Sequence, residues 1–61
     1  MRVELKKASK STTITDGIVC FIVVDGSQIA RCYSIEQGQR GARFIKANPG
    51  DYAGLSKVLY G

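Results

Sequence analysis

Histidine is absent from this 61-residue chain, and cysteine occurs only twice. A structural zinc site usually needs four Cys or His ligands, so we expect no metal site of that kind. The lack of histidine also removes the commonest general base of enzymes. The five acidic residues are scattered among expected turns and helix ends, and no two of them are placed for acid/base chemistry. We therefore predict that the protein is not an enzyme and has no catalytic residues and no cofactor.

Long apolar segments are missing as well. No stretch approaches the roughly 20 apolar residues that span a bilayer, so we expect no membrane segment. Residues 1–7 alternate between apolar and charged side chains and lack the apolar stretch of a secretion signal, which favours a cytoplasmic protein. We expect one domain over residues 1–61. A chain this short buries only roughly 60% of its unfolded surface and needs further stabilisation.

The longest apolar run extends from Ile18 to Val24 and is followed directly by Asp25-Gly26. Consecutive apolar, mostly β-branched residues are typical of a strand that is covered on both faces. Asp-Gly after such a run predicts a two-residue hairpin turn, because both turn positions need a positive φ. The sequence therefore predicts a central hairpin that ends near Ile35, with Val24 opposite Ser27.

The expected hairpin register also decides how the cysteines lie. It pairs Val19 with Cys32 and Cys20 with Arg31, which places the two cysteines on opposite faces of the sheet. A disulfide needs two Cβ atoms that face each other about 4 Å apart. We therefore expect no Cys20–Cys32 bridge, and two buried free thiols instead.

The remaining segments predict two further strands. Alternation over residues 1–6 predicts a half-buried first strand. Residues 7–17 are rich in Ser, Thr and Lys and predict a loop, in which Thr12–Thr15 could extend a strand. Residues 36–41 contain two glycines and no apolar side chain, so they predict a mobile connection to a short fourth strand over residues 42–46.

The C-terminal segment predicts a helix. Asn48 suits the N-cap, and Pro49 suits the first helical position, where its missing N–H has no partner to lose. Tyr52, Leu55 and Leu59 then form an apolar stripe. The predicted fold is α+β: a small, strongly twisted, four-stranded antiparallel sheet followed by one C-terminal helix, in the order β-β-β-β-α.

One helix cannot cover both faces of the predicted hairpin. An uncovered apolar face usually marks an interaction site in soluble proteins. We therefore predict a homodimer closed by a twofold axis, and a sheet curled into a small barrel is the alternative. The predicted interface residues are Phe21, Ile22, Tyr52, Leu55 and Leu59.

Basic residues outnumber acidic ones by nine to five, which gives a net charge of +4. Such a charge attracts polyanions, and cations on loops and strand edges can contact phosphates while exposed aromatic rings stack on bases. The favoured function is a small basic module that binds single-stranded DNA or RNA. The predicted nucleic-acid-binding residues are Lys6, Lys7, Lys10, Arg31, Tyr33, Arg40, Arg43 and Lys46.

Lysines and tyrosines at such positions are also common in proteins that bind no nucleic acid. Lysines on strand edges prevent aggregation between sheets, and a tyrosine such as Tyr33 is commonly a core or interface residue. The alternative function is a small protein-interaction module, an inhibitor or adaptor. It would dock on a larger, acidic protein through the apolar hairpin face or a sheet edge.

Overall fold

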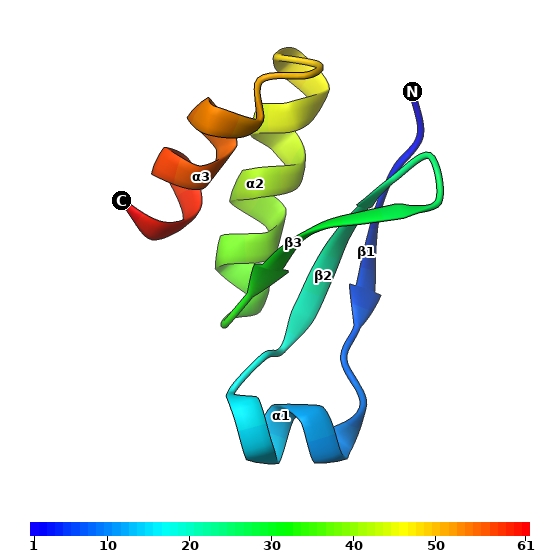
Figure 1. Ribbon diagram of the computed structural model, residues 1–61, viewed down its shortest axis with the longest axis vertical. Coiled ribbons are helices and arrows are strands. Elements are labelled where there is room, and N and C mark those ends of the chain that lie inside the picture. Colours follow the sequence, from blue (N-terminus) through cyan, green and yellow to red (C-terminus); the bar gives the residue numbers. More distant parts are fainter.

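The computed structural model describes residues 1–61. In chain order the elements are β1 (Val3–Lys7), α1 (Lys10–Asp16), β2 (Cys20–Val24), β3 (Ser27–Cys32), α2 (Ile35–Ala47) and α3 (Tyr52–Tyr60). The strands form one antiparallel sheet in the order β1-β2-β3. α2 and α3 lie together beside this sheet, and α1 joins β1 to β2 at its far end (Figure 1). The α+β class is confirmed, but the predicted four strands and single helix are wrong.

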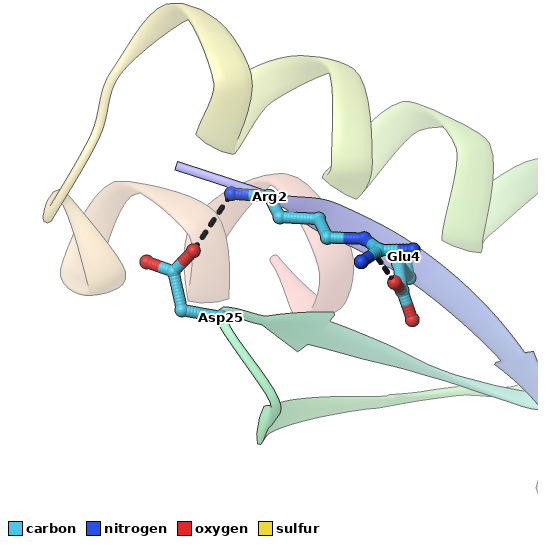
Figure 2. Close-up of polar contacts among 3 residues, drawn as sticks. All are labelled: Arg2, Glu4 and Asp25. Atoms are coloured by element: carbon cyan, nitrogen blue, oxygen red, sulfur yellow. Dashed lines mark hydrogen bonds and ion pairs between the residues drawn. The ribbon is translucent and has the colours of Figure 1, made fainter.

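The turn of the hairpin forms where the sequence predicts it. Asp25 has a φ of 50° and Gly26 a φ of 83°, so both turn positions adopt the left-handed conformation. Val24 pairs with Ser27. The Asp25 carboxylate accepts a hydrogen bond from the Arg2 backbone N–H at 2.8 Å, which joins the turn to the start of β1 (Figure 2).

A β-bulge changes the hairpin register beyond the turn. Between Val23 and Ile22 the partner residue on β3 moves by two positions, so Ile29 is an extra residue without a partner. Each later pair is displaced by one residue, and Cys20 lies opposite Cys32. The predicted placement of the cysteines on opposite faces is therefore wrong. The prediction assumes that side chains alternate between the two faces without interruption, and the extra residue shifts this alternation.

α2 occupies the segment for which the sequence predicts a mobile connection and a fourth strand, residues 36–46. The Ser34 side chain accepts a hydrogen bond from the Gln37 backbone N–H at 3.0 Å and caps the helix. Glu36 adds a negative charge to the first turn, where the helix dipole favours it. These local signals favour the start of a helix, although the two glycines make the segment look like a loop in the sequence.

The glycines of α2 form its contact surface with the rest of the protein. The buried residues of α2 are Gly38, Gly41 and Ile45, which recur at helical spacing. A β-carbon at Gly41 would lie 2.6 Å from Ile22 Cδ1 on β2, closer than van der Waals contact allows. Glycine is thus needed at this position for α2 to approach the sheet so closely.

The C-terminal helix begins later than predicted. Asp51, rather than Asn48, is its N-cap, and the Asp51 carboxylate accepts a hydrogen bond from the Gly54 backbone N–H at 3.0 Å. Asn48 instead ends α2, where its backbone N–H bonds to the Phe44 carbonyl at 2.9 Å. Tyr52 is consequently the first residue of the helix and is 53% exposed.

The predicted loop over residues 7–17 contains the short helix α1. Ser9 caps its start by accepting a hydrogen bond from the Thr12 backbone N–H at 3.2 Å, and Gly17 ends it with a φ of 75°. No residue of α1 is buried, and Ile14 is 75% exposed. The segment therefore has no apolar stripe from which a helix could be predicted, and the predicted strand extension here is wrong.

The hydrophobic core lies between one face of the sheet and the helices α2 and α3. Ile22 and Ile45 are fully buried at its centre, and Leu55 and Leu59 are the buried part of the predicted helix stripe. The complete core cluster consists of Cys20, Ile22, Val24, Cys32, Ile45, Leu55 and Leu59. Because β2 contributes every second residue to this cluster, its other residues face the opposite side of the sheet.

Candidate nucleic-acid interface

One face of the sheet has no helix packed against it. Ile22 and Val24 of β2 point into the core, so Phe21 and Val23 point away from it. Their cross-strand partners on β1 and β3 project on the same side. We call this surface the open face; its residues are Glu4, Lys6, Phe21, Val23, Gln28 and Arg31.

Two cations flank an aromatic ring on the open face. Phe21 pairs with Lys6 on β1 and with Arg31 on β3. Neighbouring strands lie about 4.8 Å apart, so the backbones of Lys6 and Arg31 each lie about 5 Å from the backbone of Phe21. Lys6 and Arg31 are exposed, and Phe21 is half-buried. We call this arrangement, Lys6–Phe21–Arg31, the cation–aromatic row.

The apolar part of the open face is small. Val23 is only 3% exposed and Phe21 is half-buried, although no helix covers either residue. Their cross-strand partners are the long side chains of Glu4, Lys6, Gln28 and Arg31, and such side chains commonly lay their apolar stems over neighbouring apolar surface. The hairpin therefore presents no large apolar face: α2 and α3 cover one side, and polar side chains flank the other.

The charge of the open face is partly compensated. Arg2 and Glu4, on the same side of β1, form an ion pair with 2.6 Å between Arg2 Nε and Glu4 Oε1 (Figure 2). This is the only ion pair in the protein. Within a single chain, Lys6 and Arg31 therefore keep charges that no carboxylate neutralises, one on each side of Phe21.

The remaining predicted cations lie elsewhere. Arg40, Arg43 and Lys46 are carried by α2, on the opposite side of the sheet from the open face. Lys10 lies in the first turn of α1, and Lys7 ends β1 on the side of the core-facing residues. The structure thus brings Lys6 and Arg31 together on the open face, and it places the other predicted cations away from that face.

A groove separates β1 from α2 on that opposite side. It has a volume of about 520 Å³ and contains two of the α2 cations. Its lining residues are Val3, Leu5, Gln39, Ala42, Arg43 and Lys46. No acidic side chain lines it, so the groove is basic.

Tyr60 of α3 closes the outer edge of β3 beside the cation–aromatic row. Its hydroxyl accepts a hydrogen bond from the Arg31 backbone N–H at 3.2 Å and donates one to the Arg31 carbonyl. The Tyr60 ring meets that of Tyr33 edge to face, with 6.4 Å between centroids. Burial raises the pKa of Tyr60 above its usual value. The predicted site residue Tyr33 thus lies near Arg31, whereas Tyr60 could not be predicted, because the contact joins residues far apart in sequence.

Gln37 fixes the chain just beyond the same end of β3. Its Oε1 accepts a hydrogen bond from the Tyr33 backbone N–H at 2.6 Å, and its Nε2 donates one to the Leu59 carbonyl at 2.5 Å. One amide side chain on α2 thus links β3 to α3. The sequence places Gln37 in a mobile connection and gives no indication of this role.

The two cysteines are free and buried side by side in the core. Burial, together with the neighbouring Cys20, raises the pKa of the Cys32 thiol to about 11. Cys32 is therefore a neutral thiol at physiological pH. Since only a thiolate is a good nucleophile, neither its burial nor its pKa suits a reactive site.

The residues predicted for a dimer interface are divided between the core and the surface. Ile22, Leu55 and Leu59 lie in the core of the chain's own fold. Phe21 lies on the open face, and Tyr52 is exposed at the start of α3.

Comparisons with protein-family models, curated proteins and solved structures find no match. The helices of the structure are all too short or too polar to cross a membrane.

Proposed function

We propose that the protein binds single-stranded nucleic acid on the open face of its sheet. The cation–aromatic row is the observation that supports this function. An aromatic ring between two uncompensated cations matches a nucleotide, which presents a flat base joined to a charged backbone.

In this proposal one base stacks on the exposed part of the Phe21 ring. Lys6 and Arg31, on the flanking strands, contact phosphates on either side of that base. Every base has a π-face, so this contact selects for unpaired bases rather than for sequence. Tyr33, exposed near Arg31 at the end of β3, offers a second ring to a neighbouring base.

Substitution of the ring separates stacking from simple charge attraction. Phe21→Leu keeps an apolar side chain on the half-buried position but removes the aromatic face. Loss of one stacked base costs about 1–3 kcal/mol, so we expect binding of a labelled single-stranded oligonucleotide to weaken about 5- to 150-fold. Fluorescence anisotropy measures this, with circular dichroism to check that the variant is folded.

Two arginines provide a matched charge control. Arg31→Gln and Arg40→Gln each remove one positive charge, but only Arg31 lies on the open face. We expect Arg31→Gln to weaken binding and to reduce the salt dependence by about one phosphate contact, and Arg40→Gln to do neither. Absence of binding at low salt would exclude the function. Equal losses from both variants would exclude the open face as its site.

The alternative function, docking on a larger acidic protein, predicts a different result. The native protein would then be recovered with one stoichiometric partner that nuclease treatment does not remove. Recovery of nucleic acid alone would contradict it.

A further inference from the structure

β1 leaves one edge of the sheet without a partner strand. The backbones of Arg2 and Ala8 hydrogen-bond toward β2, at 2.8 and 3.0 Å. Because the direction of backbone groups alternates along a strand, Val3, Leu5 and Lys7 direct their N–H and C=O groups to the free edge. An unpaired row of this kind is a template for another strand.

The free edge also exposes apolar surface. Leu5 is 38% exposed although it projects toward α2, and it lines the basic groove together with Val3. The helix α1 lies at the far end of the sheet rather than along this edge (Figure 1). A partner that adds a strand here would bury Leu5 and satisfy the free backbone groups at the same time.

We propose that this partner is a second copy of the chain, which pairs its β1 antiparallel to the first around a twofold axis at Leu5. Leu5 then lies opposite the partner's Leu5, and Val3 opposite the partner's Lys7. Each of these residues exchanges a pair of backbone hydrogen bonds across the axis. The two sheets join into one, and their open faces form a continuous surface.

The charge sequence of β1 supports this register. Glu4 and Lys6 stand on either side of Leu5 on the open face, so the axis places Glu4 opposite the partner's Lys6 and Lys6 opposite the partner's Glu4. An axis at Glu4 or at Lys6 would instead oppose identical charges. A slip by one residue would place Leu5 opposite a residue whose N–H and C=O groups point to its own β2, so the backbone hydrogen bonds across the axis could not form. An axis at Val3 would also oppose unlike charges, Arg2 and the partner's Glu4, but it would pair only residues 3–5 of each strand, whereas the axis at Leu5 pairs the whole of β1.

α2 agrees with the same axis. It runs antiparallel to β1, since Lys46 shares the groove with Val3 and Gly38 contacts Leu5 (Figure 1). The twofold axis at Leu5 therefore brings the two α2 helices alongside in opposite directions.

Backbone hydrogen exchange tests the proposal directly, and it does not depend on nucleic acid. In the dimer the amides of Val3 and Leu5 are bonded to the partner, so their protection should rise with protein concentration from the low to the high micromolar range. The amides of Glu4 and Lys6 bond to β2 within the chain and serve as internal controls, because dimerisation adds no hydrogen bond to them. Unchanged exchange of Val3 and Leu5 in a protein that sediments as a monomer at every concentration would overturn the proposal.

Charge reversal tests the register. Glu4→Lys and Lys6→Glu each create like-charge pairs across the axis, and we expect each to weaken the dimer at least about tenfold in sedimentation experiments. The double variant restores unlike pairs and should recover dimerisation to within a fewfold of the natural chain. Failure of the double variant to recover, with circular dichroism showing all variants folded, would contradict this interface.

Discussion

The substitution Gly41→Ala tests whether glycine at this position is what allows α2 to pack so closely on the sheet. A β-carbon at this position would lie 2.6 Å from Ile22 Cδ1, 2.7 Å from Leu59 Cδ2 and 3.3 Å from Leu55 Cδ1. These atoms are the ends of flexible side chains, but they belong to β2 on one side and α3 on the other. Moving α2 away from one of them drives it toward the other, and all three side chains are buried with little space to yield.

Two opposing effects determine the size of the change. Alanine is favoured over glycine in a helix by up to about 1 kcal/mol. Overpacking of a well-packed core costs about 1–3 kcal/mol. We therefore expect Gly41→Ala to lower the free energy of unfolding by about 1–2 kcal/mol, and the Tm by about 4–16 °C for a chain of this size.

Urea unfolding followed by circular dichroism measures this change, and the comparison of Arg40→Gly with Arg40→Ala is the matched control. Arg40 is exposed in the interior of the same helix, so this pair reports the helix propensity without the contacts. We expect Arg40→Gly to be less stable than Arg40→Ala by up to about 1 kcal/mol. If Gly41→Ala instead stabilised the protein by a similar amount, α2 could not lie as close to β2 as the structure places it.

Two further predictions concern the core thiols and the edge of β3. The pKa of Cys32 rises from 9.0 to about 11 in the folded protein, so folding favours the protonated thiol. This preference stabilises the fold below pH 9, and we expect up to about 3 kcal/mol of stability to be lost as the pH rises to about 11. Urea unfolding at several pH values measures the loss, which should be smaller in Cys32→Ala. Tyr60→Phe removes both hydrogen bonds to the Arg31 backbone, so we expect a loss of about 1 kcal/mol and faster exchange of the Arg31 amide by NMR; unchanged exchange would contradict the contact.

The hairpin can be predicted from sequence because its signal is local. Asp25-Gly26 is adjacent to the strand it ends, and its left-handed conformations depend on those two residues alone. The helix α2 cannot be predicted in this way. Gly38 and Gly41 are poor helix formers by themselves, and their value appears only when Cys20 and Ile22 lie against them.

The candidate site is predictable only in part, because it too depends on contacts between residues that are far apart in the sequence. Charge identifies both Lys6 and Arg31, but nothing in composition indicates which cations share a face. Phe21 is predicted for a dimer interface, although its place between buried neighbours of β2 already requires it to face the other side of the sheet. The cations of α2 are predicted to lie in a loop and a strand, so their separation from Lys6 and Arg31 cannot be anticipated.

The extra residue Ile29 links the stability of the fold to the candidate site. In the uninterrupted register that the sequence suggests, Arg31 shares a face with Ile22 and points at the helices. Burying its guanidinium there without a partner would cost several kcal/mol, more than a chain of this size can lose. The bulge instead turns Cys32 into the core and Arg31 outward, opposite Phe21. The same single-residue irregularity that removes a charge from the core therefore completes the cation–aromatic row on the open face.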